Sequence, residues 1–166
     1  MKNWELEPVE TPEKIEELCA LAAEIWQEYF TPILEPGQVP YMVEKFQSVP
    51  AVTRQIEEQG YEYRLMKLNG KAVGYTGFHL EADKLFLSKL YVHKSCRGMG
   101  LSRKTFDWLK ERCRAEGKKA IWLTVNRYNT HTIEVYRHYG FEVIREEKND
   151  IGGGYYMDDF IMEVQI

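Results

Sequence analysis

The sequence predicts one α/β domain, residues 1–166, in which a mixed β-sheet is covered by α-helices. Three observations support this fold class. A strand, a glycine-rich turn, a helix and a second strand follow one another between Leu85 and Val125, in the order of a β-turn-α-β unit. Two strand-like runs are joined by Asn69-Gly70, a strong hairpin signal because both turn positions tolerate positive φ. Apolar residues near the N-terminus recur at helical spacing.

The N-terminal elements are a short strand and a long helix. Trp4–Val9 is interpreted as the strand. Thr11 is placed to cap the helix that follows, and Pro12 suits the first turn of that helix. One apolar stripe indicates the face that the helix buries, and it consists of Ile15, Leu18, Ala22, Ile25 and Tyr29.

The middle of the chain alternates between a proline-rich loop, helices and strands. Three prolines and a glycine predict a loop over Phe30–Pro40. Helical segments are predicted at Tyr41–Gln47 and Pro50–Gly60. The two strands of the hairpin are predicted at Tyr61–Leu68 and Lys71–His79.

The central unit follows a turn at Leu80–Asp83. Its first strand, Leu85–Val92, is rich in β-branched and aromatic residues, and its second, Ala120–Val125, reads as a buried strand. Two strands joined through a helix favour a right-handed parallel crossover. The connecting helix starts after the turn Arg97–Ser102, and its predicted inner face consists of Ser102, Phe106, Leu109 and Cys113.

The C-terminal third is predicted to hold a short helix and two strands. The helix spans Thr130–Tyr139, with Asn129 or Thr130 as its cap and Gly140 as its end. Further strands are predicted at Glu142–Ile144 and Tyr155–Ile166, on either side of a flexible connection of three glycines.

Two adjacent acids, Asp158 and Asp159, fall inside the last predicted strand. Acidic residues are depleted from strand interiors. Two interpretations are open: one acid points outward and the other lies at an edge, or the pair marks a pocket for a cationic ligand.

Composition and charge exclude several classes of protein. Hydrophobic residues make up 44% of the chain and charged residues 29%, as in ordinary globular domains. A net charge of −4 gives no electrostatic support for nucleic-acid binding. No apolar run approaches the length of a membrane span, and Met1–Glu7 does not resemble a targeting peptide, so a cytoplasmic protein without a membrane partner is expected. The three cysteines form no Cys-x-x-Cys pair and the histidines lack ligand spacing, so no metal site is predicted.

The turn Arg97–Ser102 has the features of an anion site. A helix that starts at such a turn leaves free N–H groups and a positive dipole end at one place. Gly98 and Gly100 let the backbone approach a ligand, and Arg97 can hold a phosphate through two hydrogen bonds. A Walker A sequence is absent, and Arg103 stands where a dinucleotide fingerprint requires glycine.

Two motifs together resemble the GNAT superfamily of acyl-CoA-dependent N-acyltransferases. Its pattern Arg/Gln-x-x-Gly-x-Gly/Ala is matched by Arg97, Gly100 and, less well, Ser102. Its downstream pattern Asn-x6-Tyr-x3-Gly-Phe is matched by Asn129, Tyr136, Gly140 and Phe141. The resemblance implies a GNAT fold, which is a mixed, mostly antiparallel sheet of about seven strands with a splayed parallel pair and helices on both faces.

The resemblance also implies acetyl-CoA as a co-substrate and no metal. The pyrophosphate is expected on the N–H groups of the turn, and the pantetheine arm beside the backbone of Leu90 and Val92. Asn129 is expected to touch that arm, and Tyr136 to lie near the sulfur. The expected binding residues are Leu90, Tyr91, Val92, Arg97, Gly98, Met99, Gly100, Leu101, Ser102, Arg103, Asn129 and Tyr136.

For the chemistry, the resemblance implies direct attack of an amine on the thioester. Tyr136 is then the general acid, since a phenol with a pKa of ~10 can protonate a departing thiolate with a pKa of ~8.5. Glu81 and Asp158 are proposed as base or acceptor contacts. His79 and Asp83 are further candidates, and no spacing singles out one of them.

One departure from the superfamily concerns the base. Its usual glutamate on the central strand is not evident, because Ser88 and Lys89 occupy the corresponding place. A water relay to a backbone carbonyl is an equal alternative.

The predicted function is acetylation of a primary amine, with a small polyamine-like cation as the acceptor. The C-terminal run Tyr155–Glu163 resembles bacterial spermine/spermidine acetyltransferases, and Glu28, Glu35 and Asp158 suggest an acidic acceptor wall. Two alternatives are open. One is acetylation of a protein N-terminus, as in ribosomal-protein acetyltransferases, and the other is an acetyl-CoA sensor without turnover, which Ser102 favours weakly. Homodimers are common in the superfamily.

Overall fold

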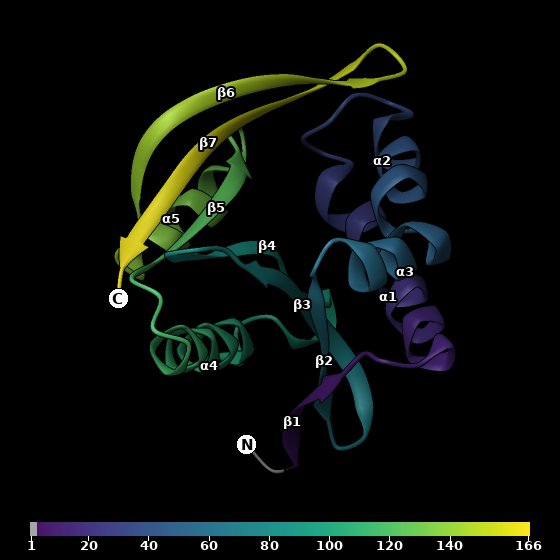
Figure 1. Ribbon diagram of the computed structural model, residues 1–166. Coiled ribbons are helices and arrows are strands. Elements are labelled where there is room, and N and C mark those ends of the chain that lie inside the picture. The colour runs from purple at the N-terminus through teal and green to yellow at the C-terminus, as the bar shows by residue number, and fades with distance from the viewer. Residues whose placement is uncertain (1–2) are drawn as a thin grey trace.

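A seven-stranded sheet runs through the middle of the protein in the computed structural model, which describes residues 3–166 (Figure 1). Met1 and Lys2 of the N-terminal segment lie outside the described residues. The elements in chain order are β1 (Trp4–Pro8), α1 (Pro12–Phe30), α2 (Gln38–Gln47), α3 (Val49–Glu58), β2 (Glu62–Leu68), β3 (Lys71–Leu80), β4 (Lys84–Val92), the 3-10 turn η1 (Lys94–Cys96), α4 (Leu101–Ala115), β5 (Ala120–Asn126), α5 (Thr130–His138), β6 (Glu142–Gly152) and β7 (Tyr155–Gln165).

The sheet has the order β1-β2-β3-β4-β5-β7-β6, and only β4 and β5 are parallel neighbours. Their pairing is short, because it extends from Lys84↔Ala120 to Phe86↔Trp122. Beyond Phe86 the two strands separate (Figure 1). The predicted GNAT fold, mostly antiparallel with one splayed parallel pair, is confirmed.

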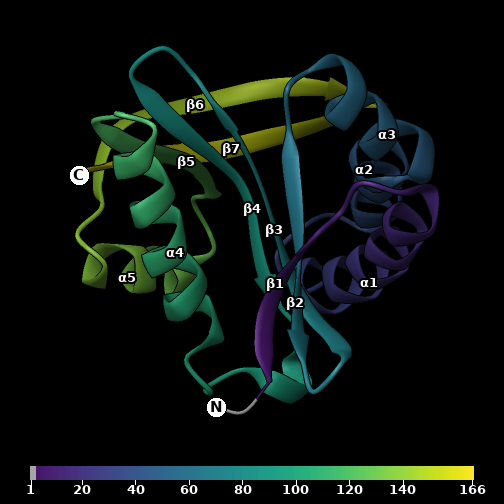
Figure 2. The same cartoon turned by 60° about the horizontal axis from the view of Figure 1, so that its bottom comes forward.

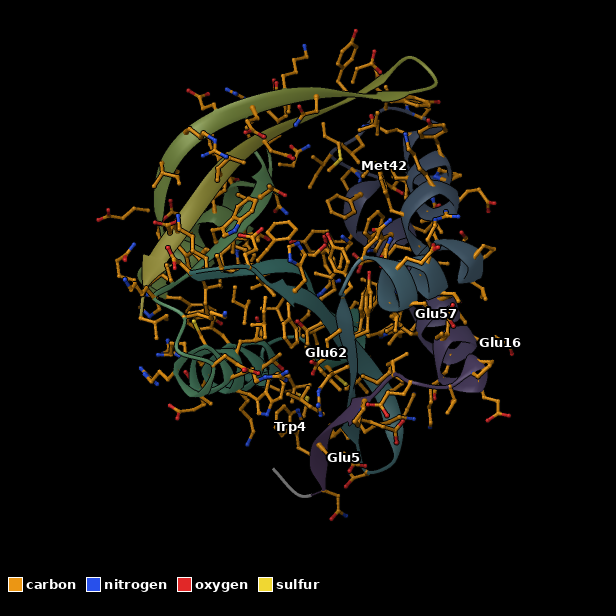
Figure 3. All side chains as sticks on the ribbon, in the orientation of Figure 1. Trp4, Glu5, Glu16, Met42, Glu57 and Glu62 are labelled. Atoms are coloured by element: carbon orange, nitrogen blue, oxygen red, sulfur yellow. The ribbon has the colours of Figure 1, made fainter. Side chains whose placement is uncertain are left out.

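Helices cover both faces of this sheet. Helices α1, α2 and α3 lie on one face, and α4 and α5 on the other (Figure 2). The predicted inner stripe of α1 is buried except for Tyr29, which is half-buried. On the α4 side of the sheet, Arg112 of α4 donates two hydrogen bonds, each 2.9 Å long, to Glu62 of β2, which is labelled in Figure 3. The buried apolar residues form two clusters, one on each face of the sheet.

Local signals set the element boundaries as predicted at several points. The Thr11 hydroxyl accepts a hydrogen bond from the Lys14 N–H at 3.3 Å and caps α1. Asn69 and Gly70 have φ of 54° and 81°, as a tight hairpin between β2 and β3 requires. No helix of residues 3–166 combines the length and the apolar character that crossing a membrane requires.

The predicted start of the second helix and the predicted end of the strand after Phe141 are wrong. Helix α2 starts at Gln38, so the loop ends before Pro40; a proline in the first turn loses no hydrogen bond, because those N–H groups have no intrahelical acceptor. Strand β6 extends from Glu142 to Gly152 rather than ending at Ile144. Among the described strands it pairs only with β7, at the edge of the sheet, so its many charged residues face solvent. These residues interrupt the alternation of apolar and polar residues by which a strand is predicted.

A β-bulge interrupts β4 next to the point of separation. Gly77 pairs with Lys89 and Phe78 pairs with Leu87, so Ser88 is the extra residue. Leu87 and Leu90 both remain in the core under α4. The bulge therefore turns Ser88 and Lys89 together toward the α1 side of the sheet, where the Lys89 Nζ lies over the Trp26 ring.

The hairpin formed by β6 and β7 crosses over to α2 and bridges the gap between the two halves of the protein (Figure 1). The Tyr41 hydroxyl donates to the Ile151 carbonyl at 2.7 Å, and the Lys45 ammonium donates to the same oxygen. The Gln38 amide donates to the Tyr156 carbonyl at 2.9 Å. Polar contacts thus fix the hairpin tip on α2.

We expect Gly152→Ala to destabilise the protein more than Gly154→Ala. Both glycines have positive φ, 89° and 82°, so both substitutions cost about 1–2 kcal/mol of strain. Only at Gly152 would the added Cβ meet another atom, the Tyr41 hydroxyl at 2.5 Å, and displacing it removes a hydrogen bond worth about 0.5–1.5 kcal/mol. Urea unfolding of the two variants measures this difference, and equal losses would show that the contact with Tyr41 contributes nothing.

Candidate active site

Two adjacent cavities open where β4 and β5 separate. The first, here called the inner cavity, has a volume of about 360 Å³ and lies between the separating strands and helices α1–α3. The β6–β7 hairpin closes one side of it through Met157 and Asp159. Met42, labelled on α2 in Figure 3, is buried in its wall.

The second cavity, here called the turn cavity, has a volume of about 380 Å³ and lies beside the glycine turn. Gly98 and Gly100 have φ of 83° and 79°, which a residue with a side chain rarely adopts. Helix α4 starts directly after Gly100 and no side chain caps it. Its free N–H groups and positive dipole end are therefore available to an anion.

Most of the predicted acetyl-CoA residues are gathered around the turn cavity. Asn129 lines the inner cavity instead, and Met99, which is 45% exposed, lines neither. The predicted residues that do line the turn cavity are Leu90, Tyr91, Val92, Arg97, Gly98, Gly100, Leu101, Ser102, Arg103 and Tyr136.

Arg97 is held in place by helix α1. Its Nε donates to the Val92 carbonyl at 3.0 Å, and its Nη2 lies 2.7 Å from the Glu28 carboxylate. The guanidinium also lies over the Tyr29 ring, 5.3 Å from the ring centroid. Because Arg97 is exposed enough to reach the cavity, it combines a fixed position with access to a ligand phosphate.

We expect Arg97→Ala to weaken acetyl-CoA binding ~10-fold or more while changing kcat little. A hydrogen bond to a charged group contributes about 1.5–3 kcal/mol, and the proposed role of Arg97 is to bind phosphate rather than to react. Isothermal titration with acetyl-CoA measures the loss. Arg114→Ala is the matched control, since Arg114 lies at the far end of α4 and pairs with Glu111. An unchanged Kd would remove Arg97 from the binding site.

The two cavities share part of their lining. Tyr136, from α5, is among the shared residues and lies at the junction. Its ring packs against Phe141, with centroids 5.4 Å apart. Burial raises the pKa of Tyr136 well above its ordinary value, so the hydroxyl keeps its proton throughout the neutral range. The residues common to both cavities are Tyr29, Leu90, Tyr91, Thr132 and Tyr136.

Asn129 ties α5 to α1 near this junction. Its amide donates to the Tyr29 hydroxyl at 2.9 Å, and that hydroxyl also shares a hydrogen bond with Thr132. Asn129 stands at the N-cap position of α5, but its side chain makes no cap hydrogen bond. The predicted capping role of its side chain is therefore wrong, because the amide is used to position Tyr29.

Asp159 is the acid that the structure brings into the inner cavity. It is 5% exposed, and burial raises its pKa to about 6, with the like charges of Asp158 and Glu147 adding to the effect. Along β7, Met157 and Ile161 share its side of the strand. That alternation is the signal that could have identified Asp159, but apolar residues on the opposite side of β7 mask it.

Lys89 is the inner cavity's basic residue. Its ammonium donates to the Ser88 hydroxyl at 2.6 Å and lies 5.9 Å from the Trp26 ring centroid. Burial lowers its pKa to about 8. The sequence places Lys89 in the middle of the predicted central strand. The bulge that turns its side chain into the cavity has no sequence signature.

The structure does not bring the predicted acids Glu81 and Asp158 to the inner cavity. Glu81 lies at the β3–β4 turn and accepts a hydrogen bond from the Trp122 indole at 2.7 Å. Asp158 faces away from the cavity and pairs with Arg127 at 2.6 Å. Because Glu28 holds Arg97 and the exposed Glu35 does not line the cavity, the predicted acidic wall is not formed.

A comparison with family models identifies the chain. Residues 19–141 match the model described as the acetyltransferase (GNAT) family. The chain belongs to the GNAT family. The matched segment contains the glycine turn, both separating strands and Tyr136.

Known GNAT proteins resemble this chain in sequence and in fold. It is 31% identical over 91 residues to the uncharacterized N-acetyltransferase YjgM of Escherichia coli; the match covers 52% of this chain and 54% of that protein, about half its length. The structure of PaiA N-acetyltransferase from Thermoplasma acidophilum in complex with coenzyme A has a TM-score of 0.81 at 19% identity and covers 99% of both chains. The ribosomal-protein-S18-alanine N-acetyltransferase of Escherichia coli has a TM-score of 0.70 at 20% identity, covering 98% of this GNAT chain and 94% of that chain.

Proposed function

We propose that this chain transfers the acetyl group of acetyl-CoA to a primary amine of a small molecule. The observation that supports this most strongly is the junction of the two cavities at Tyr136. The turn cavity offers free N–H groups and Arg97 to the phosphates of the donor. The separated part of β4 offers backbone groups near Leu90 and Val92 to an extended arm. The inner cavity then receives the amine.

In the proposed reaction, the amine nitrogen attacks the thioester carbonyl carbon, a C–N bond forms and the C–S bond breaks. The sulfur leaves as a thiolate and takes a proton from the Tyr136 hydroxyl. The ammonium form of the acceptor loses two protons in total: one replaces the proton that Tyr136 gave to sulfur, and the other leaves through Asp159 to solvent. The products are the acetylated amine and CoA with a free thiol.

Asp159 replaces Glu81 and Asp158 as the proposed base and acceptor contact. An amine with a pKa of ~10.4 needs about 4.6 kcal/mol to lose a proton at pH 7. A nearby carboxylate can hold the ammonium and take its proton, and Asp159 with a pKa of about 6 is ionised at neutral pH. Its burial in the inner cavity supports this role.

A polyamine-like acceptor, predicted from the sequence, gains no support from the charges of the inner cavity. A polycation needs several carboxylates, whereas Asp159 is the acid among the described lining residues and Lys89 brings a positive charge. A protein N-terminus is the other acceptor to test, since the fold resembles that of a ribosomal-protein acetyltransferase.

Release of thiol from acetyl-CoA tests the proposed function. The panel contains spermidine, spermine, free amino acids, an aminoglycoside and a short peptide, with a control that lacks an acceptor. Turnover with at least one amine is the expected result. If acetyl-CoA raises Tm but no amine is acetylated, the result favours the alternative of an acetyl-CoA sensor. A ligand at ~100 times its Kd stabilises the folded state by about 2.7 kcal/mol, which a melt resolves.

A homodimer is proposed only because dimers are common in the GNAT superfamily. Size-exclusion chromatography with light scattering at several protein concentrations tests it, and a mass near the chain's 19.6 kDa at all of them would contradict it.

A further inference from the structure

The inner cavity contains two charged side chains of opposite sign, the buried Asp159 and the half-buried Lys89. Lys89 enters from the bulge of β4, and Asp159 enters from β7 on the other side of the strand separation. The two groups form no ion pair with each other within 4.0 Å, although the Lys89 ammonium and the carboxylate both line a space of only about 360 Å³. One side of the cavity therefore carries a positive charge and the other side a negative charge.

Neither group forms an ion pair with another side chain of residues 3–166, although the charge of Arg127 acts on Asp159 from a distance. No carboxylate acts on Lys89, whose ammonium bonds only the neutral Ser88 hydroxyl and lies over Trp26. Asp159 accepts no side-chain hydrogen bond, and the nearby Arg127 is already held by Asp158 and Glu146. Charged groups that are shielded from water are normally paired or hydrogen-bonded, because a desolvated charge without a partner is costly. Lys89 and Asp159 are therefore both available to charged groups of a ligand.

We propose that the acceptor is an amino carboxylate, whose ammonium group is held by Asp159 and whose carboxylate is held by Lys89. This inference rests on the proposed acetyl transfer and specifies its substrate class. The amine of such a molecule lies between the acid and Tyr136, and the carboxylate points toward β4. One ligand then satisfies both charges at once, which neither a neutral amine nor a polycation does.

The rest of the cavity indicates an apolar or aromatic side chain on this acceptor. Its walls are built largely from rings on α1, α2 and β4 and from the residue before β2, rather than from further charged groups. An apolar side chain gains free energy by displacing water from such a surface. The aromatic residues that line the inner cavity and not the turn cavity are Trp26, Phe30, Phe46, Tyr61 and Phe86.

Lys89 argues against the polyamine. A second ammonium of spermidine or spermine would lie in a cavity of this size with the Lys89 ammonium, and like charges in a poorly solvated site repel each other. A free amine without a carboxylate leaves Lys89 uncompensated. Specificity therefore results from an attractive and a repulsive effect of the same residue.

The test compares matched acceptors in the thiol-release assay with the full chain. Leucine, methionine, phenylalanine and tryptophan are each compared with the corresponding carboxamide and the decarboxylated amine. We expect kcat/KM to be ~10–100-fold higher for the best amino acid than for its two analogues, as loss of a charged hydrogen bond predicts. In Lys89→Met we expect this preference to fall to about one, because the amino acid loses its partner for the carboxylate and the decarboxylated amine no longer leaves a lysine charge uncompensated. Lys89→Arg keeps a substantial part of the preference, and Lys71→Met, an exposed lysine at the start of β3, keeps all of it.

Three results overturn the inference while the proposed function stands. The first is better turnover of spermidine, a peptide or the decarboxylated amines than of every amino acid. The second is a preference for the carboxylate that survives in Lys89→Met. The third is an equal loss of turnover on all acceptors in a Lys89→Met protein that melts normally, which would place Lys89 in the reaction itself. Failure of every amine in the panel to release thiol would instead overturn the proposed function.

Discussion

Tyr136→Phe is expected to lower kcat by ~10²–10⁴-fold and to leave the Kd for acetyl-CoA nearly unchanged. The substitution removes one hydroxyl at the junction of the two cavities. The ring, which packs against Phe141, stays in place. The lost rate is that of general acid catalysis, since the thiolate must then take its proton from water.

The proton of Tyr136 is available throughout the neutral range. Burial raises the pKa of the hydroxyl, so the protonated form dominates in this range and Tyr136 adds no limb to the pH profile below pH 9. Steady-state kinetics and titration calorimetry of Tyr136→Phe measure the two constants separately. Tyr139→Phe is the matched control, because Tyr139 also lines the turn cavity and its ring stacks on Phe106, with the ring centroids 5.0 Å apart. Wild-type kcat in Tyr136→Phe would remove this residue from the mechanism.

Asp159→Asn is expected to lower kcat/KM for the amine by ~10²-fold or more and, at the same time, to stabilise the protein above neutral pH. The first effect follows from the loss of the proposed base. In the wild type, kcat/KM falls as the pH drops through about 6, the pKa of Asp159, and this limb disappears in the variant. If kcat/KM of Asp159→Asn still falls as the pH drops through about 6, the base is another group.

The stability effect has a sign that can be worked out. The pKa of Asp159 is raised from 3.8 to about 6 on folding, so the folded chain binds more protons than the unfolded chain between these values. The free energy of unfolding therefore decreases as the pH rises through this window. Above it the buried charge costs about 3 kcal/mol, which Asp159→Asn removes. Urea unfolding at pH 4 and pH 8 measures the difference.

Asp158→Asn is the control for both measurements. It removes a half-buried carboxylate whose ion pair with Arg127 lies outside the inner cavity. We expect a loss of stability below about 1 kcal/mol and a pH profile that keeps its acid limb, moved to lower pH because the charge of Asp158 contributes to the raised pKa of Asp159.

The features that were predicted correctly are those that depend on short segments. The hairpin at Asn69-Gly70 and the cap at Thr11 each require only a few residues with particular conformations or side chains. The crossover between Leu85 and Val125 follows from the order of its elements and from the handedness of such connections. The glycine turn was recognised because it matches one motif of the GNAT family and a second motif follows it at the right separation.

The features that were missed depend on contacts between distant segments. The bulge at Ser88 is set by the pairing of β4 with β3, and nothing in the residues of β4 requires it. The inward direction of Asp159, rather than Asp158, depends on the register of β7 against β5, in which Asp159 faces Asn126. A one-residue change of register would exchange the two acids. Lys89 therefore became a candidate, and Asp159 could be distinguished from Asp158, only once the sheet was known.

The shared lining of the two cavities has a consequence for inhibition. Tyr29, Leu90, Tyr91, Thr132 and Tyr136 belong to both, so the proposed donor and acceptor spaces adjoin at these side chains. A single compound that joins the sulfur of CoA to the acceptor nitrogen through a short acetyl bridge can occupy both spaces. Its second half binds from an effective concentration set by that bridge, so its avidity exceeds that of either half by ~10²–10⁴-fold without any new contact.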